Sequence, residues 1–217
     1  MSTVCPGKLK VRNFVLFMVA YTFLYIFPNV HPGVEAMMLP LLEIDRATPL
    51  IPWTFMIYTS AYVLFLIVIL LHDDVDRFKA FCRTAFGVLV ISGAFFLLMP
   101  TTYPRPVYPE SDSLFITWLM KLVSTADSPR NCFPSMHVGL TGIGAWSLRH
   151  KGPRVFAFFV VWSLLIFIST MTTKQHYFVD ILGGMGVMTF VAVIDWALFE
   201  KGVFQAVLKP AIQPKKG

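Results

Sequence analysis

The chain has 217 residues, of which 56% are hydrophobic and only 14% are charged. Soluble domains carry roughly 25% charged residues, so this composition argues against a water-soluble globular domain and favours a protein embedded in a bilayer. The net charge of +6 does not indicate nucleic-acid binding, because the basic residues stand at the ends of apolar segments. The three cysteines, Cys5, Cys82 and Cys132, show no paired spacing, which argues against a disulfide framework or a zinc motif.

Six apolar segments predict a six-helix transmembrane bundle, an all-α membrane protein with a single domain over residues 1–217. Their ranges are 14–27, 53–71, 84–99, 134–148, 155–173 and 178–199. A span needs roughly 17–25 residues, so the second, fifth and sixth segments suffice alone, whereas the others need flanking residues. The first segment follows a basic start like that of a signal peptide, but no small-residue cleavage site follows it, and we expect a retained helix.

The segment 113–124, between the third and fourth spans, is apolar with a few polar breaks. This pattern predicts a helix that lies on the membrane surface, or one that packs as a loop helix against the bundle.

The distribution of basic residues predicts the orientation of the chain. With six spans, thirteen of the 18 lysines and arginines fall on the side of the N-terminus, namely Lys8, Lys10, Arg12, Arg77, Lys79, Arg83, Arg149, Lys151, Arg154, Lys201, Lys209, Lys215 and Lys216. The outer segments hold the other five, Arg46, Arg105, Lys121, Arg130 and Lys174. Since cytoplasmic loops carry the excess of positive charge, both termini are predicted to be cytoplasmic. The short loops and compact size favour a bacterial inner membrane.

Polar residues from three distant stretches meet the outer ends of the predicted spans. They are Arg105 after the third span, Ser135 and His137 at the start of the fourth, and Lys174, His176 and Asp180 around the turn from the fifth to the sixth. The sequence therefore predicts one outward-facing pocket built within residues 100–180.

Several of these side chains are suited to binding a phosphate. A helix that begins at Pro134 and Ser135 leaves free amides that point at an anion, with a hydroxyl beside them. Arg105 can hold two phosphate oxygens at once, and Lys174 adds a point charge.

The remaining residues supply the reaction chemistry. His176 and Asp180 are four residues apart, so a helix would place them on one face. The carboxylate can hold one imidazole nitrogen and leave the other as a nucleophile. His137 is placed to protonate a leaving alcohol. Together with Cys132 these residues are also metal-ligand types, but their spacing matches no zinc motif and the neighbouring cations disfavour a metal. We expect no metal and no other cofactor.

The motifs resemble those of the type-2 phosphatidic acid phosphatase superfamily, whose signatures are Lys-x6-Arg-Pro, Pro-Ser-Gly-His and Ser-Arg-x5-His-x3-Asp. This chain has Arg105-Pro106, Pro134-Ser135-Met136-His137 and Ser169-Thr170-x5-His176-x3-Asp180. The resemblance implies a phosphohistidine on His176, with Asp180 as its partner and His137 as the acid. It also implies that Arg105 and Ser135 hold the phosphate.

The chain departs from these signatures at two positions. Leu98 stands where the superfamily has lysine, and Thr170 stands where it has arginine. Lys174 and Arg130 are predicted to replace the missing charges. The stretches 45–58, 100–106 and 173–177 resemble the branch related to inositol phosphorylceramide synthases. The resemblance thus consists of separate stretches within roughly residues 40–195.

Three functions stay open at this point. The leading one is a metal-independent lipid phosphatase whose site faces the extracytoplasmic side. The second is a phosphotransferase, in which a lipid or polyol hydroxyl resolves the same phosphohistidine. The third is a non-catalytic phospholipid-binding membrane protein, which the losses at positions 98 and 170 favour. The expected partners are the bilayer and a phospholipid or isoprenoid-phosphate substrate, with no nucleic acid; the sequence predicts no oligomeric state.

Overall fold

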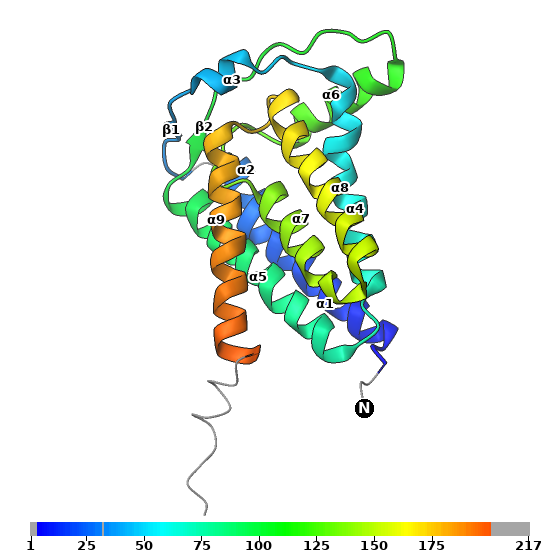
Figure 1. Cartoon of the computed structure of the whole chain (residues 1–217). Coiled ribbons are helices and arrows are strands. Elements are labelled where there is room, and N and C mark those ends of the chain that lie inside the picture. The colour runs from blue at the N-terminus through cyan, green and yellow to red at the C-terminus, as the bar shows by residue number, and fades with distance from the viewer. Residues whose placement is uncertain (1–3, 32, 201–217) are drawn as a thin grey trace, which may run out of the picture.

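The computed structural model describes residues 4–31 and 33–200, and its regular structure there is almost entirely helical (Figure 1). The long helices are α1 (Gly7–Tyr21), which continues through Thr22–Ile26 into α2 (Phe27–Val30), α4 (Phe55–Leu71), α5 (Val75–Leu98), α8 (Pro153–Thr172) and α9 (Phe178–Asp195), which continues through Trp196–Glu200. The shorter elements are α3 (Glu43–Ala47), α6 (Leu114–Ala126), α7 (Met136–Ser147), the single turns Pro52–Thr54 and Arg149–Lys151, and the strands β1 (Met37–Met38) and β2 (Thr101–Thr102).

Five helical stretches are long and apolar enough to cross a membrane, which indicates an integral membrane protein. They run over Gly7–Val30, Pro52–Leu71, Val75–Leu98, Pro153–Thr172 and Phe178–Phe199. Five of the six predicted spans are therefore confirmed as apolar helices of sufficient length. The third begins nine residues before its predicted start, because the Asp74 side chain accepts a hydrogen bond from the Arg77 amide and caps α5.

The predicted fourth span corresponds to α7, which has only 12 residues. At 1.5 Å per residue this helix is about 18 Å long, well short of a hydrocarbon core of about 30 Å. The structure thus does not establish a sixth span. Instead α7 lies inside the bundle and packs against α4, α5, α8 and α9.

Close packing around α7 depends on glycine at a few positions. A Cβ at Gly184 of α9 would lie 2.4 Å from the carbonyl oxygen of Ser135, and a Cβ at Gly142 would lie 2.1 Å from Sδ of Met188. The Met188 side chain could move away from a Cβ at position 142, but the main-chain oxygen of Ser135 could not move away from one at position 184, so Gly184 permits the close approach of α7 and α9. This contact brings the start of α7 against the start of α9.

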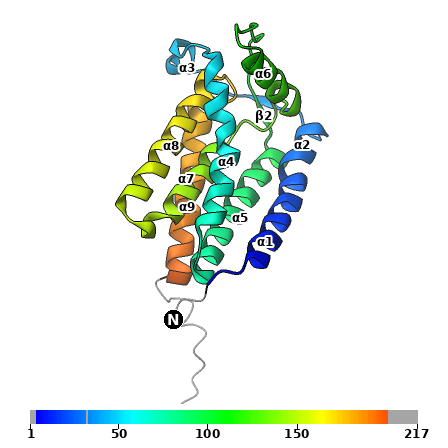
Figure 2. The ribbon, with the colours of Figure 1, turned by 90° about the vertical axis from the view of Figure 1, so that its right-hand side faces the viewer.

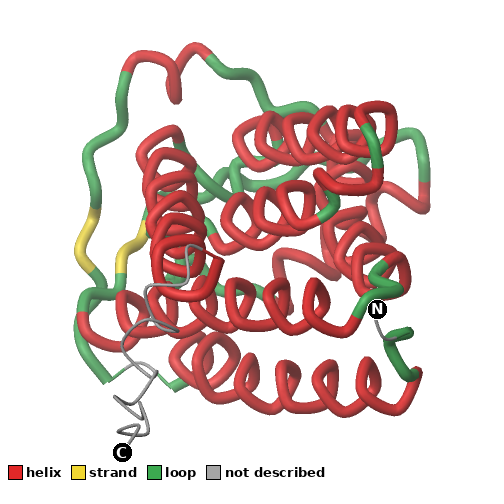
Figure 3. Tube along the Cα trace, turned by 60° about the horizontal axis from the view of Figure 1, so that its bottom comes forward, coloured by secondary structure: helices red, strands yellow, loops and turns green. Residues whose placement is uncertain are grey.

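One end of the bundle gathers the long loops (Figure 2). There β1 and β2 form a two-residue parallel pair, visible as two short yellow segments in Figure 3, which the sequence did not predict. Helix α6 forms where a helix was predicted, and its buried face packs on Phe55 and Tyr58 of α4. Its opposite face stays exposed and apolar, as at Leu114 and Trp118. Placement of this helix on a membrane surface stays a prediction.

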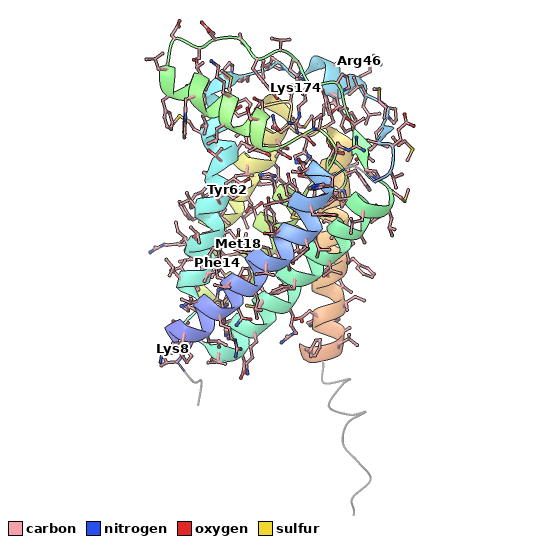
Figure 4. All side chains as sticks on the ribbon, turned by 180° about the vertical axis from the view of Figure 1, so that it is seen from behind. Lys8, Phe14, Met18, Arg46, Tyr62 and Lys174 are labelled. Atoms are coloured by element: carbon pink, nitrogen blue, oxygen red, sulfur yellow. The ribbon has the colours of Figure 1, made fainter. Side chains whose placement is uncertain are left out.

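The labelled residues in Figure 4 show how the charges are distributed between the ends. Lys8 lies at the end where α1 begins, whereas Arg46 and Lys174 lie at the loop end. Both ends of the described chain lie at the end of the bundle opposite the long loops (Figures 1 and 2). Four of the basic residues predicted to be cytoplasmic, Lys201, Lys209, Lys215 and Lys216, fall outside the described residues.

Candidate active site

His176 lies in a tight turn between α8 and α9 and is almost fully buried, with 4% of its surface exposed. The carbonyl oxygen of Thr170 accepts hydrogen bonds from the amides of Gln175 (3.1 Å) and His176 (3.0 Å), which closes the end of α8. Lys174 takes the left-handed conformation, with φ of 56°, and this reverses the chain toward α9. The residue that replaces the superfamily arginine, Thr170, therefore shapes the turn through its main chain.

The imidazole of His176 is held at one nitrogen. Its Nδ1 lies 3.0 Å from the carbonyl oxygen of Cys132 and 3.4 Å from Oδ2 of Asp180. A carbonyl oxygen only accepts hydrogen bonds, so Nδ1 carries the hydrogen in this arrangement. The lone pair then lies on Nε2, the nitrogen that is available as a nucleophile.

Asp180 is fully buried and organises the start of α9. Its carboxylate accepts hydrogen bonds from the amide of Tyr177 (3.0 Å) and the hydroxyl of Tyr103 (3.3 Å). Burial, together with the nearby Asp180 carboxylate, raises the pKa of Tyr103 above its usual value, so the hydroxyl keeps the hydrogen that it donates. The predicted proximity of His176 and Asp180 is confirmed, but the predicted reason is wrong. Helix α9 begins at Phe178, so capping geometry and not a shared helical face brings the two together.

The start of α7 provides the opposite wall of the site. Ser135 is fully buried and caps α7, where its hydroxyl oxygen accepts from the amide of Val138 at 3.4 Å. Its own amide donates to the carbonyl oxygen of Asp180 at 3.0 Å, which ties the second motif directly to the third. The free amides at this end of α7 and the helix dipole favour an anion.

His137 stands in the first turn of α7 beside His176. The centroids of the two rings are 5.8 Å apart, and Nδ1 of His137 lies 3.4 Å from the Tyr58 hydroxyl. Nε2 of His137 is buried and has no hydrogen-bond partner among the described residues. A buried polar atom without a partner is costly, which is consistent with a group that meets a ligand.

Arg105 reaches the same region from the loop after β2. Its guanidinium donates to the main-chain carbonyl of Asp127, and Nη2 lies 3.8 Å from the Asp127 carboxylate. Burial raises the pKa of the Cys132 thiol, Asp180 adds to this effect, and Arg105 opposes it. Nε of Arg105 is buried without a partner among the described residues, so one donor is available for a ligand.

The two predicted replacement charges lie elsewhere in the loop end. The ammonium of Lys174 donates to the main-chain carbonyls of Asp45 (2.8 Å) and Thr48. Nη2 of Arg130 donates to the carbonyl of Val34 at 2.6 Å. Both side chains thus hold the segment before α4, and in the described part of the chain neither forms a hydrogen bond with the His176 imidazole.

Sequence reasoning missed several residues that support the site. Asp127 accepts hydrogen bonds from the Tyr25 hydroxyl (2.8 Å) and the Asn29 amide (3.0 Å), in addition to its contact with Arg105. Nothing in the sequence distinguishes Asp127, because the same outer segment also holds Glu110 and Asp112. Asp45 accepts from the Phe178 amide at 2.8 Å and so steadies the start of α9, a role with no local signal.

A metal site finds little support in this donor set. Among the described residues no group of three histidine, cysteine or acidic side chains comes together. Cys132 offers its carbonyl oxygen to His176, while burial raises the pKa of its thiol and disfavours the thiolate that a metal requires.

The fold and the site together define an all-α membrane-type protein with a buried histidine–carboxylate pair at two helix N-termini. The profile of the PAP2 superfamily matches residues 33–194, and the chain belongs to this superfamily. Membership supports a phosphatase-type activity on lipid phosphates. A search of curated proteins finds no match for the chain.

Proposed function

We propose that this protein is a metal-independent lipid phosphate phosphatase that works through a phosphohistidine on His176. The observation that carries the proposal is the arrangement around that imidazole. Nδ1 is engaged by the Cys132 carbonyl and Asp180, Nε2 is left as the nucleophile, and His137 lies beside it at the start of α7.

In the first step, Nε2 of His176 attacks the phosphorus and the bond from phosphorus to the lipid oxygen breaks. His137 gives a proton to that oxygen, which leaves as a lipid alcohol. His137 acts as the acid in its imidazolium form, in which Nδ1 donates to the Tyr58 hydroxyl oxygen and Nε2 carries the proton that passes to the leaving oxygen. The developing positive charge on His176 is balanced by Asp180.

In the second step, water attacks the phosphorus of the phosphohistidine. His137, now neutral, takes a proton from that water, and inorganic phosphate leaves while His176 is restored. Throughout, the amides at the start of α7 and the free donor of Arg105 stabilise charge on the phosphoryl oxygens.

The membrane topology belongs to the same proposal. We infer that the loop end faces the extracytoplasmic side and that both termini are cytoplasmic, in a bacterial inner membrane. The supporting observation is the excess of lysine and arginine in the segments assigned to the other end. In this arrangement α7 completes six passes together with the flanking turns, although its helical part does not cross the whole hydrocarbon core.

A second candidate is a phosphotransferase of the inositol phosphorylceramide synthase type. The stretches 100–106 and 173–177 resemble that branch. The first half-reaction would be the same, and a lipid or polyol hydroxyl would replace water in the second. A third candidate, phospholipid binding without turnover, rests on the losses at positions 98 and 170.

The test uses the purified full chain in detergent with a chelator present. Wild type and His176→Ala are incubated with labelled phosphatidate, isoprenoid phosphates and inositol phospholipids, and both free phosphate and new lipid products are followed. Free phosphate from the wild type alone is the expected result. New phospholipid without free phosphate would instead establish the transferase. Lipid binding without turnover by either protein would support the non-catalytic candidate. Activity that is absent in chelator and returns when a divalent ion is added would contradict metal independence.

A further inference from the structure

A cleft of about 220 Å³ lies between α1, α4 and α7 and reaches the proposed leaving-group histidine. His137 and Met136 line its upper end. Phe14 and Met18 line one wall from α1, and Tyr62 lines the facing wall from α4, as the labels in Figure 4 show. The cleft is thus continuous with the site described above.

Below His137, the walls of this cleft are aliphatic and aromatic. Phe17, Ala61 and Tyr25 are buried and form its floor. The Phe17 ring packs against Phe65, with centroids 5.0 Å apart, and closes the lower part. The polar groups of the lining are His137, Thr141 and the tyrosine hydroxyls.

The outer rim of the cleft opens toward the surroundings of the bundle. Met18 on α1 is 40% exposed and Leu66 on α4 is 46% exposed. Helix α1 packs mainly on α5, whereas α4 packs on α7 and α8, so the cleft occupies the seam between α1 and α4 above the contact of Phe17 with Phe65. Both rim residues belong to helices that are apolar enough to cross a membrane, so this opening faces lipid.

We propose that the α1–α4 cleft binds one hydrocarbon chain of the lipid phosphate substrate, which moves in sideways from the bilayer. This inference rests on the proposed function and makes it more specific. A water-soluble phosphomonoester needs no apolar cleft beside its leaving oxygen, whereas a lipid alcohol carries hydrocarbon close to that oxygen, directly in an isoprenoid alcohol and through the glycerol esters in a diacylglycerol. The position of His137 at the end of the cleft therefore links the proton donor to the base of the chain.

The size of the cleft limits what it holds. A volume of 220 Å³ equals about seven water-sized groups, since one water occupies about 30 Å³ of liquid. One alkyl or isoprenyl segment fits this space, and two chains side by side do not. The second chain of a two-chain lipid would stay in the bilayer outside the seam.

The test places a larger side chain on either wall of the cleft, so that less room is left for a hydrocarbon chain. Leu66→Trp on α4 and Met18→Trp on α1 are each expected to lower kcat/KM for a long-chain lipid phosphate by about tenfold or more. For a short, water-soluble phosphomonoester the same variants are expected to stay within about twofold of the wild type. Leu70→Trp is the matched control, because Leu70 is 71% exposed one turn further along α4 and does not line the cleft.

A loss that is equal for both substrates, or absent for both, would overturn the proposal, provided that the variants unfold at the same temperature as the wild type. The two wall variants come from different helices, so failure of one to fold does not remove the test.

A second measurement does not need turnover. His176→Ala is loaded with a phosphatidate whose chain carries a photoreactive group, and the adducts are mapped. Adducts in peptides from α1 and α4, reduced by excess unlabelled phosphatidate, are expected. Adducts spread over all outer helical faces, or adducts that unlabelled phosphatidate does not reduce, would overturn the cleft assignment. If the wild type released no phosphate while the adducts stayed on α1 and α4, the catalytic proposal would fail and the cleft would stand as a lipid site.

Discussion

The two ends of the bundle each carry a pair of neighbouring histidines. At the loop end the rings of His137 and His176 are 5.8 Å apart, and at the opposite end those of His72 and His150 are 6.0 Å apart. In each pair, Nδ1 of one histidine forms a hydrogen bond with a main-chain carbonyl oxygen. For His176 the carbonyl is that of Cys132, and for His72 it is that of Val68, at 2.8 Å. Histidine separation alone therefore does not distinguish the two places.

The difference lies in the helix ends that surround each pair. His137 and His176 meet the N-termini of α7 and α9, whose free amides favour an anion. His72 and His150 follow the C-termini of α4 and α7, whose free carbonyls disfavour an anion, and the helix start next to His72, that of α5, is already capped by the Asp74 carboxylate. His72 is instead stacked on Phe81, with centroids 5.0 Å apart. A histidine pair becomes a plausible phosphate site only where the helix ends have the right polarity.

The largest expected effect comes from a comparison of one variant in each histidine pair. His176→Ala removes the proposed nucleophile and should lower phosphate release by at least about 10⁴-fold. His150→Asn, at the other end, should leave kcat within about threefold. Phosphate release by purified, well-folded variants is the measurement. Near-normal turnover by the His176 variant, or a comparable loss in the His150 variant, would remove the distinction between the ends.

His137→Asn should lower turnover of a lipid phosphate by about 10²- to 10⁴-fold, because the leaving alcohol then departs without a proton. A substrate with a nitrophenolate leaving group needs little protonation, so the loss in its first step should be much smaller. Single-turnover rates with both substrates measure this. Equal losses for the two would mean that His137 has another role.

Acid should lower the stability of the protein through His72, at the end of the bundle opposite the loops. Burial lowers the pKa of His72 to about 4, below its ordinary value near 6.5. The folded state therefore resists protonation. The stability contribution is complete above pH 6.5 and is lost as pH falls toward 4, by up to about 3 kcal/mol. Thermal unfolding in detergent across this range should show the decline, and His72→Gln should flatten it. An unchanged slope in that variant would place the sensitivity elsewhere.

Asp127→Asn should loosen the guanidinium of Arg105 and lower kcat/KM by roughly tenfold, about 1.4 kcal/mol. Combining it with Arg105→Gln should cost little more than Arg105→Gln alone, because both remove one function. Tyr25→Phe is the matched control, since it removes one hydrogen bond to Asp127 and leaves the charge. Additive losses in the double variant would show that Asp127 does not act through Arg105.

The smallest effect concerns Lys174, where sequence and structure differ most. The sequence suggests a phosphate ligand, whose removal would cost about 2–4 kcal/mol in the transition state. The structure binds its ammonium to two carbonyls of the segment 45–48. Lys174→Met should therefore reduce stability by about 1 kcal/mol and change kcat by less than tenfold. A loss of 10²-fold or more at unchanged stability would support the phosphate-ligand role.

The predicted elements agree with the structure where hydropathy is strong, and less so where tertiary contacts decide. Block hydrophobicity was enough to place α4, α8 and α9, because each is an uninterrupted apolar run. The start of α5 was missed because its first turn is charged and depends on the Asp74 cap. The apolar segment 134–148 agrees closely with α7, but the flanking residues that were expected to lengthen it into a span do not, because Ser135 caps its start and the helix gives way to Arg149–Lys151 at its end.

For the site, motif spacing was sufficient to predict that His137, His176 and Asp180 meet. It did not identify what each basic side chain contacts. The positions of Lys174 and Arg130 depend on carbonyls from the first loop segment, more than 90 residues away in sequence. The same holds for Asp127, whose partners Tyr25 and Asn29 lie about 100 residues earlier. Such long-range hydrogen bonds leave no periodic signal in a single chain.

The carboxylate of Asp180 has a consequence for how this protein tolerates change. Its side chain caps the start of α9, accepts a hydrogen bond from the Tyr103 hydroxyl and lies beside the His176 imidazole. The main-chain carbonyl of the same residue accepts a hydrogen bond from the Ser135 amide. The three-residue interval to His176 is therefore set by the geometry of the turn as much as by the reaction. An insertion or deletion within it would disrupt helix start and imidazole together. Engineering of a new lipid substrate specificity has more freedom along the α1–α4 seam than in the stretch from His176 to Asp180.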